Sequence, residues 1–350
     1  MNGNGTPRAT MMDVARKAGV SLKSVSRVIN GEDHVSQKLR DKVKTAIEAM
    51  GYVPDVAARS LAGNRNFTIG LLFDNPSANY RMKIQAGAYE ACRNAGYHLR
   101  IDSLSAQAEG ADLEQQIAAV VRQNRCDGLV LTPPLTDNLQ ILDILERSQI
   151  PYVRIAPVLA PGRSKAVEMD DYQAGCDVAR MLHALGHRHF AVINGPLYHG
   201  RAGYRRNGFV ETFRSLCPDA EIMEEPGDFT FYSGMIAGKK ILSRSNGPIA
   251  IFATNDDMAA GALNAAQQMG LRVPEDVSVC GFDDGIIAMT VWPYLTTIHQ
   301  PIAEMAEVAV QMLIDWADKE PSLRHIDYHM VERDSVAAPG ENSNSISSQP

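Results

Sequence analysis

The sequence predicts a small all-α head followed by a two-lobe α/β region that contains two doubly wound parallel sheets. Residues 10–53 hold three short segments with helical periodicity. From residue 67 onward, continuous apolar strands alternate with amphipathic helices, which is typical of parallel sheets covered by helices. Seven such strands over the remaining chain fit two lobes better than a single sheet.

Two helices joined by a tight turn are predicted between residues 10 and 30. Thr10 can cap the first helix, Gly19 can end it, and Ser21 can cap the second. The second helix leaves six side chains free to face outward: Leu22, Lys23, Ser24, Ser26, Arg27 and Asn30. Lysine, arginine, asparagine and hydroxyl groups suit phosphates and base edges, so the segment indicates a DNA-binding helix-turn-helix. The alternative is an ordinary solvated helical hairpin.

A third helix and a hinge complete the N-terminal part. Ser36 can cap the third helix, which we expect to run to Met50. Residues 54–64 suit a two-turn hinge helix, which is marginal in water and should order only on DNA. Leu61 in this hinge is the type of side chain that wedges between base steps from the minor groove.

The strands and helices of the α/β region follow from apolar runs and amphipathic segments. Strands are expected at Thr68–Phe73, Tyr97–Ser103, Gly128–Thr132, Tyr152–Ile155, Phe190–Asn194, Ile249–Ala253 and Val277–Gly281. Helices are expected at Asn79–Ala95, Asp112–Arg125, Asn138–Ser148, Tyr172–Leu185, Tyr204–Leu216, Ser233–Ser243 and Asp256–Gly270. The first four strand-helix pairs should form one lobe, to which Ile302–Ala317 returns, and a cleft between the lobes would hold a ligand.

Composition and charge agree with a globular DNA-binding protein. Of 350 residues, 45% are hydrophobic, yet no apolar run approaches a membrane span and the N-terminus lacks the core of a signal peptide. We therefore expect a cytoplasmic protein. The net charge is -7, but residues 1–63 carry ten basic and six acidic side chains, a balance of +4 that leaves -11 for the rest. This asymmetry favours a basic head on an acidic sensor.

Six segments, in order, resemble the lactose-repressor (LacI/GalR) family of bacterial transcription regulators, and the resemblance covers residues 10–334. They read D-V-A-R-K-A-G-V-S with S-V-S-R-V-I-N, A-A-R-S-L-A, G-H-R-H-F-A-V-I-N-G-P, A-T-N-D-D-M-A-A-G-A, D-V-S-V-C-G-F-D-D and L-T-T-I-H-Q-P. The resemblance implies a periplasmic-binding-protein-like fold and a homodimer whose two heads bind a near-palindromic double-stranded operator. It also implies repression controlled allosterically by a small ligand.

The resemblance assigns roles in DNA binding residue by residue. Leu22 and Lys23 would read bases, with Arg27 beside them. Phosphates would be held by Ser21, Ser24, Ser26 and Asn30. In the hinge, Leu61 would kink the central step while Ala58 and Arg59 lie in the minor groove. Because many relatives carry a polar or aromatic residue where this chain has Leu22, the operator sequence does not transfer.

For the effector, the family's sugar-binding positions map onto Asp74, Arg205, Asn255 and Asp283. Carboxylates can accept hydrogen bonds from hydroxyls, and a guanidinium can donate to them. Further stacking or polar contacts could come from Asn75, Tyr80, Phe229 and Trp292. A carbohydrate is the expected effector, with a purine or nucleoside acting as co-repressor as the alternative. Without the family, Asp283 would be interpreted as a turn residue and Arg205 as part of a surface salt bridge.

The domain boundaries follow from these assignments: 1–9 flexible N-terminus, 10–53 head, 54–64 hinge, 65–335 effector-binding and dimerisation domain, and 336–350 disordered tail. No enzyme is expected, since the sequence has no nucleophile elbow and no phosphate-binding glycine spacing. His183 and His187 have the spacing of some metal pairs, but a glycine turn separates them and a structural role is preferred. Five scattered cysteines favour neither disulfides nor a metal site, so we expect no metal and no cofactor.

Overall fold

The computed structural model describes residues 9–29, 35–52, 65–105, 110–123, 126–218, 221–316 and 320–340. The chain divides into two compact units, Met1–Phe67 and Thr68–Pro350. No helix in these described segments has both the length and the hydrophobicity needed to span a lipid bilayer.

The first unit is a three-helix head made of α1 (Met11–Ala18), α2 (Leu22–Ile29) and α3 (Gln37–Met50). Thr10 caps α1 as predicted: its hydroxyl accepts from the Asp13 amide, and the Asp13 carboxylate accepts from the Thr10 amide at 3.0 Å. Gly19 ends this helix with φ +60°, a conformation that costs glycine little. Apolar side chains from all three helices form its core: Val14, Ala15, Ala18, Val25, Val43, Ala46 and Tyr52.

The caps of the other two head helices differ from each other. Ser21 caps α2 as predicted, because its Oγ accepts from the Ser24 amide at 3.1 Å. Ser36 does occupy the N-cap position of α3, but within the described residues its side chain makes no capping hydrogen bond. The prediction for Ser36 is therefore right in position and wrong in mechanism.

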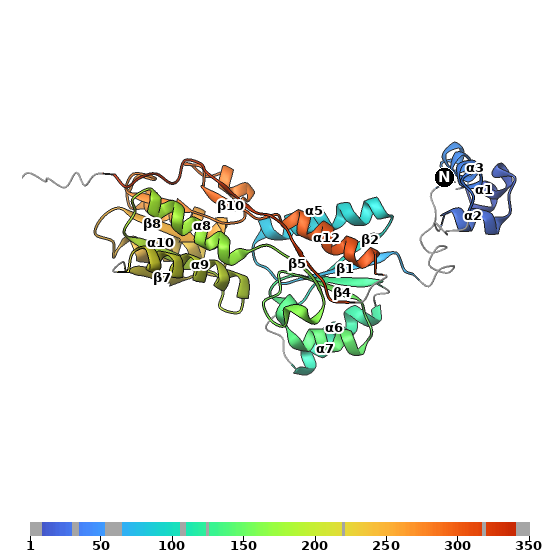
Figure 1. Cartoon of the computed structure of the whole chain (residues 1–350), viewed down its shortest axis with the longest axis horizontal. Helices are drawn as coiled ribbons and strands as arrows, with labels where there is room; N and C mark the ends of the chain where they lie inside the picture. Colours follow the sequence, from blue (N-terminus) through green and yellow to red (C-terminus); the bar gives the residue numbers. More distant parts are fainter. Residues whose placement is uncertain are drawn as a thin grey trace, which may run out of the picture. The chain divides into compact units, whose positions relative to one another are not determined.

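The second unit contains two parallel sheets. The first lobe has a six-stranded sheet in the order β11-β5-β4-β3-β1-β2, and Figure 1 labels its strands β1, β2, β4 and β5. Its strands are β1 (Thr68–Phe73), β2 (His98–Ser103), β3 (Gly128–Leu131), β4 (Tyr152–Ile155), β5 (Lys165–Glu168) and β11 (Leu323–His325). Its helices are α5 (Ala78–Ala95), α6 (Gly110–Gln123), α7 (Leu139–Arg147) and α12 (Ile302–Ile314), of which α5 and α12 pack together, as do α6 and α7.

The second lobe has a four-stranded sheet in the order β7-β6-β8-β9. Its strands are β6 (Phe190–Asn194), β7 (Ile222–Pro226), β8 (Ile249–Ala253) and β9 (Val277–Cys280). The helix pair α8 (Asp171–Ala184) and α9 (Gly200–Leu216) packs on one face, and the pair α10 (Phe231–Leu242) and α11 (Asp256–Gln268) packs on the other. An antiparallel pair, β10 (Thr297–His299) and β12 (His329–Val331), completes this lobe.

The two lobes are joined by three crossings of the chain. The first follows β5, the second runs from β10 to α12, and the third runs from β11 to β12 (Figure 1). The predicted return of Ile302–Ala317 to the first lobe is confirmed for its described part, since α12 packs against α5. These three connecting segments form a hinge about which the two lobes can move relative to each other.

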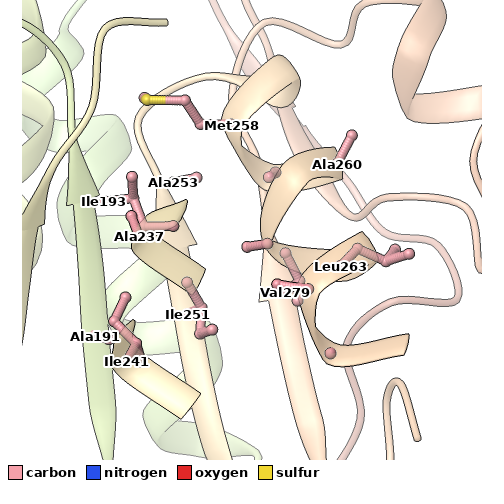
Figure 2. Close-up of a cluster of buried hydrophobic side chains, with 14 of the residues drawn as sticks. Ala191, Ile193, Ala237, Ile241, Ile251, Ala253, Met258, Ala260, Leu263 and Val279 are labelled. Carbon is pink, nitrogen blue, oxygen red and sulfur yellow. The ribbon is translucent and has the colours of Figure 1, made fainter. Parts of the chain in front are cut away.

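Apolar side chains, many of them alanines, fill one face of the second lobe's sheet. Figure 2 shows Ile251 on β8 and Val279 on β9 beside Ala237 on α10 and Leu263 on α11. The helices α10 and α11 approach so closely that a Cβ on Gly261 would overlap the main-chain oxygen of Phe231. Close packing of this kind makes the lobe a rigid support for the loops at its edge.

Several elements differ from the sequence predictions. The strands β5, β7, β10, β11 and β12 were not predicted, because they are short or carry charged side chains. The predicted start of the disordered tail, residue 336, is also too early in the sequence. The Ala337 amide donates to Ser278 Oγ at 3.2 Å, so this part of the chain is ordered. The Gly340 amide likewise donates to the Glu275 oxygen, so the chain packs on the second lobe through residue 340, and residues 341–350 lie outside the described part.

Candidate functional site

The first candidate site is the exposed face of α2 in the head. Ser21, Leu22 and Lys23 are exposed at its N-terminal end, and Leu22 is 47% exposed although it is apolar. Ser24, Ser26 and Arg27 are half-buried on the same helix. No acidic residue lies in its first turn. This surface has a positive charge at a helix N-terminus, as contact with phosphates requires.

Some predicted DNA contacts cannot be placed. Asn30, Ala58, Arg59 and Leu61 lie outside the described residues.

The hydroxyls of Ser21 and Ser24 lie 2.9 Å apart, so both take part in the local cap of α2. Their remaining lone pairs and protons stay available to a partner.

The second candidate site is a cavity between the two lobes. It lies at the carboxyl ends of the parallel strands, where ligands of α/β proteins bind. Its lining comes from both lobes: Asn75, Ser77, Tyr80, Pro133, Ala156, His199, Arg201, Arg205, Phe229, Asn255, Asp283 and Gln300. Six of the predicted effector residues therefore share one cavity.

Two predicted residues fall elsewhere in the described structure. Asp74, at the end of β1, is half-buried and is absent from the lining, although its neighbour Asn75 belongs to it. Trp292 is 66% exposed and its ring stands edge-on to Tyr294 rather than at the cavity. Both residues lie in the loop that follows β1, and in this loop Asn75 lines the cavity while Asp74 does not.

Arg205 on α9 is a buried arginine at the centre of the cavity wall. Its Nε donates to Asp171 Oδ1 at 2.8 Å, Nη1 to the Thr254 oxygen at 2.9 Å, and Nη2 to Gln300 Oε1 at 3.1 Å. The guanidinium also lies 3.7 Å from the ring centroid of Phe282. These three bonds use three of its five N–H groups, so two donors remain for a ligand.

Asp283 follows β9 and faces Arg205. Its Oδ1 lies 3.6 Å from Arg205 Nη1, beyond hydrogen-bond distance, and has no hydrogen-bond partner within the described structure. Burial raises the pKa of this carboxyl to about 7, although Arg205 and Lys83 act in the opposite direction. The carboxyl can thus accept or donate a hydrogen bond near neutral pH.

His199 is a lining residue that the sequence did not single out. It ends the loop after β6, is 6% exposed, and neither of its ring nitrogens has a hydrogen-bond partner among the described residues. Burial, and then the charge of Arg205, lowers its pKa to about 3, so the ring is neutral. A neutral imidazole offers one donor and one acceptor. Its position directly before α9, in the loop that follows β6, is the signal that could have identified it.

Asn255 and Asn75 use their side chains for local structure. Asn255 caps α11, with Oδ1 accepting from the Met258 amide at 3.0 Å and Nδ2 donating to the Phe229 oxygen at 3.1 Å. Asn75 Oδ1 accepts from the Ser77 amide at 2.9 Å. Both residues therefore shape the cavity wall and retain only part of their hydrogen-bonding capacity for a ligand.

The aromatic part of the lining consists of Tyr80 and Phe229. Tyr80 is buried on α5, and burial followed by the charge of Asp283 raises its pKa, so its hydroxyl stays protonated. Phe229 is 4% exposed and has φ +67°. The bond from Asn255 to its main-chain oxygen fixes this unusual backbone conformation.

The lobes are closed over the cavity, whose volume is about 20 Å³. That is space for about one water molecule. Hydrogen bonds connect the two sides: Ser77 Oγ donates to Asp257 Oδ2 at 2.8 Å, and Arg201 Nε donates to the Ala156 oxygen at 2.9 Å. A sugar or a base can enter only when the lobes part or the lining side chains move.

His183 and His187 have the spacing of some metal pairs, but each ring contacts a different part of the second lobe. Nε2 of His187 lies 2.8 Å from the Ala337 oxygen, and the ring of His183 packs edge-on to Phe213. In the described part of the chain, no group of three or more His, Cys, Asp or Glu side chains could hold a metal ion. His187 instead attaches the C-terminal segment to the second lobe.

Two family models match the chain. Residues 10–55 match the model described as bacterial regulatory proteins, lacI family. Residues 179–336 match the model of a periplasmic binding protein-like domain. The first match covers the helix-turn-helix head, and the second covers the second lobe and the C-terminal part of the first.

Comparison with curated proteins gives relatives over nearly the whole length. The HTH-type transcriptional repressor PurR of Salmonella paratyphi A is 38% identical over 347 residues, covering 94% of this chain and 97% of the relative. The repressor of the same name from Klebsiella pneumoniae is 37% identical over 344 residues, with the same coverage.

Comparison with solved structures also gives matches over nearly the whole chain. The complex of the transcriptional regulator CelR with cellobiose has a TM-score of 0.70 at 29% identity and covers 94% of this chain and 100% of the other. The lac repressor dimer bound to operator and the anti-inducer ONPF has a TM-score of 0.74 at 27% identity and covers 95% and 100%. The chain belongs to the lacI family of bacterial regulatory proteins and is a ligand-responsive, DNA-binding repressor.

Proposed function

We propose that the interlobe cavity binds a small uncharged ligand rich in hydroxyl groups, most simply a carbohydrate, and that this ligand controls operator binding. The observation that carries the proposal is a group of buried polar atoms that find no hydrogen-bond partner among the described residues: Oδ1 of Asp283 and both ring nitrogens of His199. Leaving such atoms unbonded costs free energy, which a ligand can recover. A hydroxyl both donates and accepts, so adjacent hydroxyls match a carboxylate and a neutral imidazole together.

The charges around the cavity favour an uncharged ligand. Arg201 is paired with Glu168 and Asp171, and Arg205 is paired with Asp171. Asp283 adds a further carboxyl beside them. The two guanidinium groups are thus already neutralised, and a phosphate would have no excess positive charge to bind.

A purine is the second candidate, because relatives named PurR are 38% identical over 94% of this chain. The aromatic rings of Tyr80 and Phe229 in the lining could stack on a base, and Asp283 could accept from its N–H groups. A purine presents its donors and acceptors only in the plane of its rings, whereas a polyol presents hydroxyls in several directions, which is why we place the purine second.

A ligand screen tests the proposal directly. The purified full-length chain would be heated with glucose, ribose, cellobiose, adenine, guanine and hypoxanthine, since a ligand that binds the folded state raises the melting temperature. We expect a sugar to give the largest shift and Asp283→Ala to abolish it while the protein still binds operator DNA. A shift with the bases alone would favour the purine alternative, and a shift that survives in Asp283→Ala would overturn the proposed site.

For the DNA, we propose that Leu22 and Lys23, with Arg27, read bases and that Ser21, Ser24, Ser26 and Asn30 hold phosphates. The exposure of Leu22 and Lys23 at the N-terminal end of α2 supports this assignment. The hinge contacts proposed for Ala58, Arg59 and Leu61 rest on the sequence alone. Leu61→Ala should weaken operator binding in a gel-shift titration without changing ligand affinity, and an unchanged operator affinity would remove the hinge role.

We propose that the chain acts as a homodimer that pairs two heads on a near-palindromic operator in the cytoplasm. Support comes from an apolar groove on the first lobe, lined by Met82 and Tyr89 of α5 and Ile101 of β2, which are 47%, 58% and 42% exposed. Two copies of such a face can cover one another about a two-fold axis. Tyr89→Asp should shift the sedimentation of the protein from dimer to monomer, with Tyr172→Asp on the second lobe as a control.

A further inference from the structure

The turn that carries Asp283 has an unusual backbone. Asp283 has φ +108° and the next residue, Asp284, has φ +50°. Both values lie in the left-handed region, which a residue with a Cβ adopts only where its surroundings enforce it. The direction of the Asp283 carboxyl therefore depends on the groups that hold this turn.

Part of the support comes from the same lobe. The Asp283 amide donates to the Ile298 oxygen at 2.9 Å, and the Gly285 amide donates to Asp256 Oδ2 at 2.6 Å. The Asp284 side chain is bonded to His299. These bonds fix the amides and one side chain of the turn but leave its two consecutive main-chain oxygens to another partner.

That partner comes from the other lobe. Nζ of Lys83 on α5 donates to the main-chain oxygens of Asp283 and Asp284 at 2.9 and 2.8 Å. One helical turn earlier, Asn79 Oδ1 accepts from the Ile286 amide at 3.3 Å. Residues four apart lie on one face of a helix, so α5 holds the turn at two points.

We propose that Lys83 is a positioning residue of the effector site, which sets the direction of the Asp283 carboxyl from the opposite lobe. This inference rests on the proposed effector site. The Lys83 contact makes ligand binding and lobe closure depend on each other. When the lobes part, the turn loses its bonds to Lys83, and the Asp283 carboxyl loses its fixed direction. Binding at Asp283 then favours the closed arrangement, because only that arrangement fixes the turn.

Amide hydrogen exchange on the full-length protein tests the inference without any ligand. Lys83→Met and Lys83→Gln should each raise exchange of the amides of residues 283–286 by about tenfold, as expected when bonds to a charged group are lost. Lys83→Arg keeps the charge and should largely restore protection. Arg93→Met, an exposed substitution at the end of the same helix, is the matched control and should leave the turn unchanged.

A second measurement separates positioning from general stability. The Lys83 charge lowers the pKa of Asp283 against the effect of burial. In protein labelled with ¹³C at the aspartate carboxyls, Lys83→Gln should therefore raise the pKa of Asp283, whereas Lys83→Arg should not.

Two outcomes would overturn the inference: unchanged exchange at residues 283–286 in both neutral variants, or an equal rise across the whole second lobe. The first would show that the turn holds itself, and the second that Lys83 only stabilises the fold. A failure of the effector proposal would appear elsewhere, as the absence of any ligand-induced shift in the wild-type protein.

Discussion

The imidazole of His199 stands edge-on to the ring of Phe229, with centroids 4.9 Å apart and planes at 81°. The edge-to-face arrangement holds the neutral ring of His199 in place. Because the contact with Phe229 uses no nitrogen, both hydrogen-bonding positions of His199 remain available to whatever enters the cavity. A buried ring held in this way suits recognition of a ligand better than it suits stability of the fold.

His199→Phe should weaken ligand binding without weakening the fold. The larger apolar ring keeps the contact with Phe229 but removes a donor and an acceptor, so we expect affinity for the sugar that gives the largest thermal shift to fall about tenfold or more. The melting temperature without ligand should stay the same or rise, because two unbonded buried atoms are removed. Titration calorimetry checks the affinity, and His189→Asn at an exposed position is the control. Unchanged affinity would mean that His199 only fills space.

Asp283→Asn should alter how stability depends on pH. Below pH 3.8 the Asp283 carboxyl is protonated in the folded and the unfolded chain, and its folded pKa is about 7. Between these values the unfolded chain releases the proton while the folded chain keeps it, so this group's contribution to stability falls as pH rises, by roughly 4 kcal/mol in total.

An asparagine cannot titrate, so the variant lacks this loss. Urea unfolding at pH 5 and pH 8 should show the free energy of unfolding of Asp283→Asn rising relative to wild type by a few kcal/mol at the higher pH. Asp102→Asn, at a half-buried carboxyl paired with Arg100 on β2, provides the comparison. Parallel pH dependences in the wild type and Asp283→Asn would show that the pKa of Asp283 is not raised.

The sequence predicted well those elements whose residues are all buried. The strand Ile249–Ala253 was predicted to the residue, because an unbroken apolar run between helices has few other interpretations. The edge strand Ile222–Pro226 was missed, since it contains Glu224 and Glu225. Their charges are satisfied by neighbouring basic side chains, such as Arg206, that lie near only in the folded chain.

For the cavity, too, the sequence could not predict contacts that form only in the folded chain. Asp283 was selected because the G-F-D-D motif resembles the family, and it lines the cavity between the lobes. His199 had no motif, and its isolation from other polar groups appears only once α9 and Phe229 pack around it. Asn255 lines the cavity, but its capping bond to α11 depends on where that helix begins.

Gly87→Ala should destabilise the first lobe. Gly87 on α5 lies against α12, and a Cβ there would overlap the main-chain carbonyl of Ala303. Backbone cannot move aside as a flexible side chain can, so we expect a loss of about 1–3 kcal/mol or more. Chemical unfolding of the full chain measures the loss, and Gly162→Ala is a matched control, because no atom of the described residues beyond its chain neighbours lies within 4 Å of a Cβ at that position. Equal stability of the two variants would contradict the close packing of α5 on α12.

Lys23→Ala should change which operators the protein selects. Lys23 is exposed beside Leu22 at the end of α2 that would enter the major groove. If its ammonium donates to the edge of a guanine, the variant should lose about 1–3 kcal/mol of discrimination at one base position in each half-site. Lys17→Ala, on the exposed surface of α1, removes the same charge without touching α2 and should lower affinity evenly across sequences. Selection from random DNA followed by sequencing distinguishes the two effects, since a relaxed position in the consensus marks a base contact. The same consensus from wild type and Lys23→Ala would instead place Lys23 on the phosphate backbone and leave the reading of bases to Leu22 and Arg27.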